Sequence, residues 1–243
     1  MQKETWTWTS AHLREPARLA RWGHFGAPLL LFPSAGGDYE ETERFGLVQS
    51  LSWLVDAGRI KVYSVDGLAV ADWVRATLPP EECAHRQTVY DAFIHEEVVP
   101  RVRRDCQNDD LTLLTAGVSL GAFEAVAALT LHPENFRVAI GLSGVYDLSG
   151  YLRGALSGDY NRSAPLSFLP SLIEGPRLQQ LRQRMVVIMT GEGDLEMPEQ
   201  SRQLASVLES KGIPHSLRML GPGRNHDWHS WRELLPPCVA EFT

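Results

Sequence analysis

Apolar residues occur along this chain in two patterns, and segments of one pattern alternate with segments of the other. Short continuous apolar runs bounded by glycine, proline or aspartate are typical of buried strands, and apolar residues three or four positions apart are typical of amphipathic helices. Near the beginning, the strictly alternating TWTWTS (5–10) predicts a half-buried strand, and 16–24 predicts a second one. The apolar runs predict further strands at 27–34, 59–67, 111–117, 136–143, 184–191 and 213–220, and the spaced stripes predict helices at 39–57, 81–107, 120–131, 198–212 and 227–242.

The order of these elements predicts an α/β fold. Repeated strand–helix units make parallel strands with helices on both faces of the sheet, whereas the two early strands are antiparallel. We therefore expect a single domain over residues 1–243 with a mostly parallel, twisted sheet. Ligands of such sheets bind beyond the carboxyl ends of the strands. Residues 146–184, rich in proline, glycine and serine, predict an irregular insertion beside that binding site.

Composition and charge narrow the possible partners. A formal net charge of -7 argues against nucleic acid and against an anionic membrane surface. The apolar runs are too short to span a bilayer, and the N-terminus lacks the pattern of a signal peptide. The three cysteines, without CxxC spacing, predict reduced thiols in a cytoplasmic protein that needs no metal or other cofactor. No feature of the sequence predicts an oligomeric state.

The segment LTLLTAGVSLGAFEAVAALTLHP (111–133) begins as a strand and ends as a helix. At the junction, Gly117-Val118-Ser119-Leu120-Gly121 has the form G-x-S-x-G, which raises a serine hydroxyl above the sheet on a sharp turn. Ser119 is therefore the candidate nucleophile. The alternative is that the two glycines only allow the helix to pack closely on the strand.

A serine nucleophile needs a base, and in this architecture an acid and then a histidine follow the serine in the chain. Four histidines follow Ser119. His132 is expected to cap a helix end, and His215 to begin a strand. His226 lies in the glycine-rich loop GPGRNHDW, before the last helix, whereas His229 is expected in the first turn of that helix. His226 is the candidate base, the alternative being a loop histidine that caps the helix.

The acid and the oxyanion donors are less constrained. The loop after the strand 184–191 contains Asp194, the first candidate for the acid, and Glu196, the alternative. Either side chain could instead cap the following helix. The oxyanion hole is expected to use the N–H of Leu120 and a second N–H, from Ala35 or Ser34, in the loop PSAGGD. The alternative for this loop is a plain turn.

The residues that line the substrate pocket are expected to come from the insertion and from the loop after 59–67. The alternative is that these side chains only pack beneath a long loop. The candidates are Trp73, Tyr146, Tyr151, Leu152, Tyr160, Leu166 and Phe168.

The segments GVSLGAFEAVAALTLHPENFRVAIGLSGVYD (117–147) and NHDWHSWRELLP (225–236) resemble the esterase family of α/β-hydrolases. This family includes esterase D-like S-formylglutathione hydrolases, enterochelin esterases, feruloyl esterases and mycolyltransferases. The resemblance extends from about residue 28 to residue 236 and implies the α/β-hydrolase fold. It also implies Ser119 as nucleophile, His226 as base and Asp194, or Glu196 slightly later, as acid. The sequence PSAGG departs from the usual HG-type loop of the family.

Three functions are compatible with these residues. The leading hypothesis is a serine carboxylesterase that hydrolyses a small or medium carboxylic ester through an acyl-enzyme on Ser119. An acyltransferase would use the same triad with an alcohol in place of water. The third function is that of a non-catalytic binding protein on the same fold. Such a protein is expected to have lost a triad residue, whereas this sequence contains Ser119, His226 and candidate acids. A peptidase ranks below these, because the chain has no room for a gating domain.

Overall fold

The structure is a computed structural model that describes residues 1–67, 78–151 and 158–243. Its centre is one eight-stranded sheet with the strand order β1-β2-β4-β3-β5-β6-β7-β8. β1 pairs antiparallel with β2, and β2 pairs antiparallel with β4, whereas the neighbours from β4 to β8 are parallel. The predicted mostly parallel sheet with antiparallel N-terminal strands is confirmed. The strands are β1 (Lys3–Thr9), β2 (Pro16–Trp22), β3 (Ala27–Phe32), β4 (Ile60–Val65), β5 (Leu113–Val118), β6 (Phe136–Leu142), β7 (Met185–Thr190) and β8 (His215–Met219).

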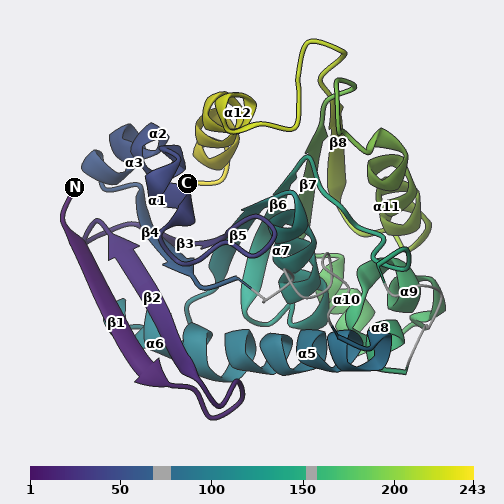
Figure 1. The fold of residues 1–243 in the computed structure, drawn as a ribbon, viewed down its shortest axis with the longest axis horizontal. Helices are drawn as coiled ribbons and strands as arrows, with labels where there is room; N and C mark the ends of the chain where they lie inside the picture. The colour runs from purple at the N-terminus through teal and green to yellow at the C-terminus, as the bar shows by residue number, and fades with distance from the viewer. Residues whose placement is uncertain (68–77, 152–157) are drawn as a thin grey trace.

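Helices cover both faces of the sheet, as Figure 1 shows. The central strands are buried along their whole length because apolar side chains of both faces meet helices. One face packs against α1 (Glu41–Arg44), α2 (Leu47–Ser50), α3 (Ser52–Asp56) and α12 (Trp228–Ala240). The other face packs against α5 (Pro80–Phe93), η1 (Ile94–Val98), α6 (Val99–Asp105), α7 (Leu120–Leu131), α8 (Gly158–Ser163), α9 (Pro165–Phe168), η2 (Leu169–Ser171), α10 (Pro176–Leu181) and α11 (Pro198–Ser210).

The helix expected over 39–57 is divided into the three short helices α1, α2 and α3. Gly46 separates the first two with a left-handed backbone (φ 76°), which ends an α-helix. The side chain of Arg232 packs against Gly46 and donates to the carbonyl of Phe45 (2.8 Å). The prediction of one continuous helix was wrong. The apolar stripe in the sequence does not reveal that a side chain from the distant helix α12, Arg232, packs at this break.

The helix expected over 81–107 is present but changes its winding. The segment η1 is a π-helix between α5 and α6. Pro100 follows within two residues, and its ring nitrogen cannot donate the hydrogen bond that an α-helix would make to the carbonyl of Glu96. The wider turn therefore lies where the regular hydrogen-bond ladder has to be interrupted.

The segment 146–184 contains short helices joined by turns, as expected. Two of its residues expected to line a pocket are part of the core instead: Tyr146 and Tyr160 are 0% and 2% exposed. Tyr151, Leu166 and Phe168 are partly buried against the same core. Trp73 and Leu152 lie outside the described residues. For the described members of this group, ordinary packing is the better description.

Candidate active site

Ser119 lies between β5 and α7 in the predicted strand–turn–helix. Its backbone has φ 57° and ψ -121°, a strained conformation for a residue with a Cβ atom. The N–H of Ser119 donates to the carbonyl of Leu142 on β6 (3.0 Å), and its own carbonyl accepts from the N–H of Ala122 (3.1 Å). These bonds hold the turn sharp, and the side chain remains half-buried at the carboxyl end of β5.

The two glycines of the motif allow the backbone to approach closely on two sides. A Cβ atom on Gly117 would lie 1.9 Å from the carbonyl oxygen of Gly121. A Cβ atom on Gly121 would lie 2.2 Å from the carbonyl oxygen of Pro33, in the loop after β3. Both distances are impossible for real atoms. The absence of side chains at these two positions therefore allows α7 to pack closely against β5 and against the loop that follows β3.

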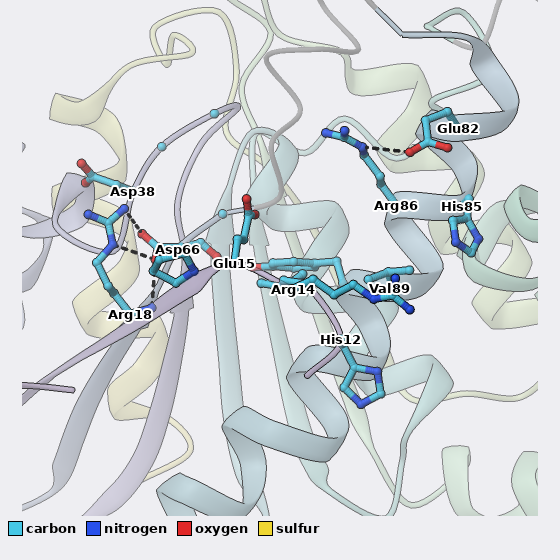
Figure 2. A pocket seen from close by; sticks show the side chains of 16 residues that line it. His12, Arg14, Glu15, Arg18, Asp38, Asp66, Glu82, His85, Arg86 and Val89 are labelled. Carbon is cyan, nitrogen blue, oxygen red and sulfur yellow. Dashed lines mark hydrogen bonds and ion pairs between the residues drawn. The ribbon is translucent and has the colours of Figure 1, made fainter. Parts of the chain in front are cut away.

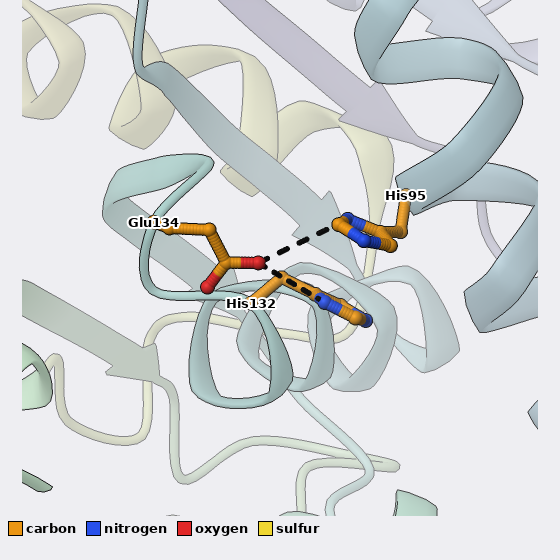
Figure 3. A group of neighbouring side chains, drawn as sticks. All are labelled: His95, His132 and Glu134. Carbon is orange, nitrogen blue, oxygen red and sulfur yellow. Dashed lines mark ion pairs between the residues drawn. The ribbon is translucent and has the colours of Figure 1, made fainter. Parts of the chain in front are cut away.

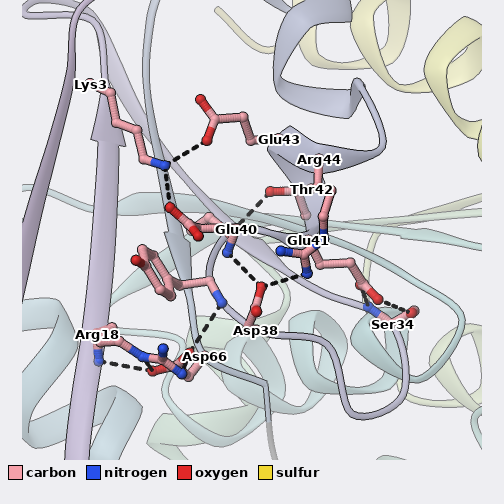
Figure 4. A network of polar contacts seen from close by, with 12 residues as sticks. Lys3, Arg18, Ser34, Asp38, Glu40, Glu41, Thr42, Glu43, Arg44 and Asp66 are labelled. Atoms are coloured by element: carbon pink, nitrogen blue, oxygen red, sulfur yellow. Dashed lines mark hydrogen bonds and ion pairs between the residues drawn. The ribbon is translucent and has the colours of Figure 1, made fainter.

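That loop, residues 33–37, is held by a side chain that the sequence did not single out (Figure 4). The carboxylate of Glu41 accepts from the N–H of Ser34 (2.6 Å) and from its hydroxyl (2.8 Å). Glu41 is only 9% exposed, and a Cβ atom on Gly37 would lie 2.4 Å from its Oε2. An acidic residue a few positions after a glycine loop is the only sequence signal for this role.

This arrangement separates the two expected oxyanion donors of the loop. The N–H of Ser34 is already bonded to Glu41, whereas Ala35 is exposed beside it. Leu120 is the first residue of α7, so its N–H has no acceptor within the helix. Of the three expected donors, the N–H of Ser34 is therefore already bonded, and Leu120 and Ala35 remain the candidates.

The loop of His226 packs against the loop that follows β7. A Cβ atom on Gly191 would lie 2.0 Å from the carbonyl oxygen of Arg224, and the N–H of Gly193 donates to that carbonyl (3.2 Å). The N–H of His226 donates to the carbonyl of Asp194 (3.5 Å). The main chains of the two loops thus bring the candidate base next to both candidate acids.

The imidazole of His226 is enclosed on one side. Its Nδ1 atom is buried without a hydrogen-bond partner, and its ring meets the edge of the Trp231 ring at a centroid distance of 5.1 Å. Burial lowers the pKa of His226, while the negative charges of Glu196 and Asp227 act in the opposite direction. His226 is therefore mostly neutral at pH 7, which is the form that a base requires.

Glu196 is held by hydroxyl groups at the ends of two parallel strands. Ser143, directly after β6, donates to Oε1 (2.6 Å), and Thr190, the last residue of β7, donates to Oε2 (2.9 Å). The indole N–H of Trp231 donates to the Ser143 hydroxyl (2.8 Å). Trp231 therefore contacts His226 with its ring and orients Glu196 through Ser143. Ser143 and Thr190 were missed in the sequence, although polar residues at adjacent carboxyl ends of strands are a usable signal.

The other candidate acid and the other histidines have different surroundings. The side chain of Asp194 is exposed, and its recorded contact with His226 is through the backbone. Neither acid caps α11, whose N-cap is Met197 without a side-chain bond. His132 is the C-cap of α7, and His215 begins β8, as expected. His229 lies in the first turn of α12, which Asp227 caps through the N–H of Ser230 (2.7 Å).

The structure brings Ser119, His226 and Glu196 to one edge of the sheet without closing the triad. Among the described residues, no side-chain hydrogen bond joins Ser119 to His226 or the imidazole of His226 to the carboxylate of either acid. In enzymes without substrate such bonds are often long and tighten only when the substrate is bound.

A pocket of about 720 Å³ lies beside the loop 33–37 (Figure 2). Gly36 and Gly37 form part of its wall, but Ser119 and His226 are not among its described lining residues. Much of the lining is charged and paired, as in the Arg18–Asp66 ion pair (2.9 Å). The pocket therefore adjoins the loop 33–37 rather than the candidate nucleophile.

The fold and these residues correspond to an α/β-hydrolase. Residues 40–242 match the model of the family described as "Putative esterase", and the chain belongs to this esterase family. It is therefore a hydrolase. No curated protein matches the sequence. None of the helices within the described residues is long and apolar enough to cross a membrane.

Three of the solved structures with the same fold cover almost the whole chain. A ferulic acid esterase has a TM-score of 0.76 at 16% identity, with 100% of this chain and 97% of that chain covered. An S-formylglutathione hydrolase from Agrobacterium tumefaciens has a TM-score of 0.75 at 15% identity, covering 98% and 93%. MPT51 of Mycobacterium tuberculosis has a TM-score of 0.73 at 17% identity, covering 99% and 97%. At these identities the likeness shows the fold.

The contact of Gly121 with the loop after β3 can be tested by Gly121→Ala. The added methyl group overlaps the carbonyl of Pro33, so we expect a loss of about 1–3 kcal/mol in the free energy of unfolding. The measurement is urea denaturation followed by tryptophan fluorescence. Gly150→Ala is the control, because a Cβ atom there meets nothing within 4 Å. Equal stability of the two variants would show that the close approach is not a real constraint.

The role of Glu41 can be tested by Glu41→Gln. The side-chain amide of Gln has one acceptor oxygen and one NH₂ donor, so it cannot accept hydrogen bonds from both the N–H and the hydroxyl of Ser34 as the two carboxylate oxygens do. We expect exchange of the hydrogen-bonded amides of Ser34 and Gly37 to become roughly tenfold faster, because a charge-assisted bond of about 1.5 kcal/mol is lost. Glu40→Gln removes a partly exposed carboxylate that pairs with Lys3 and Tyr39 rather than with Ser34, so it should leave this exchange unchanged. Unchanged exchange in Glu41→Gln would remove Glu41 from the account of the loop.

Proposed function

We propose that the protein is a serine carboxylesterase with Ser119 as nucleophile, His226 as base and Glu196 as the acid that orients the base. The observation that carries the proposal is the position of Ser119. It occupies a strained, sharply turned backbone between β5 and α7, in a chain of the esterase family. A serine at such a turn presents its hydroxyl at the carboxyl edge of the sheet, where ligands of this architecture bind.

In the first half of the reaction, Ser119 Oγ attacks the carbonyl carbon of the ester while His226 takes the hydroxyl proton. The negative charge on the carbonyl oxygen is stabilised by the N–H groups of Leu120 and Ala35. Collapse of this tetrahedral intermediate breaks the bond to the alcohol, which leaves with the proton from His226. In the second half, His226 takes a proton from water as its oxygen attacks the acyl carbon. The bond from that carbon to Ser119 Oγ then breaks, His226 returns the proton to Oγ, and the carboxylic acid is released.

Glu196 is preferred over Asp194 on three grounds. Its carboxylate is fixed by Ser143 and Thr190, so it is already oriented before a substrate arrives. Its charge acts on His226, opposing the effect of burial on the pKa of the imidazole. The buried, unpartnered Nδ1 of His226 is the atom that such an acid should bind. Asp194 offers only its carbonyl to His226 and keeps its side chain in solvent.

The substrate class we propose is a small or medium carboxylic ester. Support comes from the fold neighbours, one a ferulic acid esterase and one an S-formylglutathione hydrolase. These differ in the group that leaves: an alcohol in one case and a thiol in the other. Short-chain aryl esters, whose leaving groups make few demands on a pocket, are therefore suitable first substrates for this protein.

The nucleophile is tested by Ser119→Ala with p-nitrophenyl acetate and butyrate. Removal of the hydroxyl leaves no atom to form the acyl-enzyme, so we expect kcat to fall by at least about 10⁴-fold. Labelling by a fluorophosphonate probe should be lost in the same variant. Ser143→Ala is the matched control for labelling, since it removes a nearby serine hydroxyl that only positions Glu196. Hydrolysis that survives in Ser119→Ala would refute the proposal.

The choice of acid is tested by comparing Glu196→Gln with Asp194→Asn. We expect kcat to fall by about 10²–10⁴-fold in Glu196→Gln and by less than about threefold in Asp194→Asn. The pH profile gives an independent readout. In the wild type, kcat/KM should rise as His226 loses its proton below pH 7 and then stay level, because its pKa is lowered by burial. Loss of the Glu196 charge lowers this pKa further, so the acid limb should move to lower pH.

The opposite result would identify Asp194 as the acid. In that case Asp194→Asn would show the large fall in kcat and the shift of the acid limb, and Glu196→Gln would show neither. Circular dichroism of both variants checks that the folds are equal before the rates are compared.

A further inference from the structure

Two histidines and a glutamate meet at the amino-terminal edge of the parallel strands, away from the candidate active site (Figure 3). His95 belongs to the π-helix η1, His132 is the C-cap of α7, and Glu134 lies in the turn before β6. Their donor atoms all lie within 4.8 Å of one another. Nδ1 of His132 is 3.4 Å and Nδ1 of His95 is 4.0 Å from Oε1 of Glu134.

The hydrogen bonds around this cluster fix which atoms face inward. Nε2 of His132 lies 2.9 Å from the Asp91 carboxylate, and since a carboxylate only accepts, this nitrogen carries the hydrogen. In the neutral imidazole, Nδ1 then has a lone pair directed toward Glu134. The side-chain amide of Asn135 lies 2.5 Å from Nδ1 of His95 through its Nδ2 atom, so that nitrogen is also an acceptor. The second imidazole thus also presents a lone pair.

Three acceptors therefore face one small space. A lone pair 3.4 Å from a carboxylate oxygen is repulsive unless a positive charge lies between them. The carboxylates of Asp91 and Glu134 face the two nitrogen atoms of the His132 ring, so a cation between His132 and Glu134 would be stabilised by nearby negative charge.

We propose that His95, His132 and Glu134 bind a divalent transition-metal ion, with Zn²⁺ as the best fit. Two imidazoles and one carboxylate are a common ligand set for zinc, with water in the fourth position. The contact between Asp91 and His132 is the outer carboxylate that typically orients a zinc-bound histidine. The proposal does not depend on the esterase mechanism.

The geometry needs one adjustment. The imidazole planes are 10° apart and their centroids 3.9 Å apart, so their lone pairs leave the rings nearly parallel. One ring must turn about its Cβ–Cγ bond before both nitrogens can point at one ion. His95 has room to turn, because its side chain is 34% exposed, and Glu134 is 48% exposed. The metal would replace the amide hydrogen of Asn135 at the His95 lone pair.

The location indicates a structural role. The helix α7 has 12 residues and separates Ser119 at its start from His132 at its end, a length of about 18 Å. The ion would join two segments that are distant in sequence: η1, which carries His95, and the turn between α7 and β6, which carries both His132 and Glu134. These separate origins also explain why the sequence has no metal-binding motif: His95 and His132 are 37 positions apart.

The test is isothermal titration of the metal-free full-length protein with ZnCl₂, supported by the visible absorption of bound Co²⁺. We expect one tight site, a Co²⁺ spectrum of tetrahedral type and a rise in Tm with Zn²⁺. Glu134→Gln and His95→Ala should each weaken Zn²⁺ binding by at least tenfold. Asp91→Asn, which leaves the three ligands in place, should weaken it by about 10–100-fold.

The control is Glu96→Gln, which removes a neighbouring exposed carboxylate that pairs with His12 instead. It changes the net charge as Glu134→Gln does, so it should leave Zn²⁺ affinity within about twofold. The proposal is wrong if Zn²⁺ does not bind, or if it binds equally to wild type, His95→Ala and Glu134→Gln, which would indicate adventitious surface binding. Hydrolysis of p-nitrophenyl acetate by these variants is measured separately and is not expected to change.

Discussion

The close approach of three backbone segments around Gly117 and Gly121 is the constraint on which the rest of the structure depends. Because neither residue has a Cβ atom, α7 can begin directly against β5 and against the loop after β3. This contact brings the sharp turn at Ser119 and the start of α7 against the loop after β3. The candidate nucleophile and the two expected oxyanion donors therefore depend on one close approach of the backbone.

A second group of contacts orients the candidate base and the candidate acid from the opposite face of the sheet. Trp231 enters from α12, packs its ring against His226 and donates to Ser143, which in turn donates to Glu196. One buried side chain thus links a loop after β8 to the ends of β6 and β7. The two hydroxyl donors fix the orientation of the Glu196 carboxylate before any ligand is bound.

The two ends of α7 have different chemistry for the same topological reason. In a parallel sheet, the helix that follows a strand begins at the carboxyl edge and returns to the amino edge. Its beginning therefore carries Ser119 into the ligand-binding edge, and its end carries His132 to the far edge, beside His95 on η1. A structural ion at that edge would stabilise the scaffold of the active site without entering it.

The sequence alone determined the order and type of the strands, the strand–turn–helix at Ser119 and the loop position of His226, because each depends on residues close together in the chain. It did not reveal the break at Gly46, since that break depends on Arg232 packing from α12. It also left Asp194 and Glu196 open, because two residues in one loop differ only in which side chain the fold turns inward. Ser143, Thr190 and Glu41 acquire their roles only through contacts between segments. Local patterns determine elements, whereas the partners of buried polar groups are decided by tertiary packing.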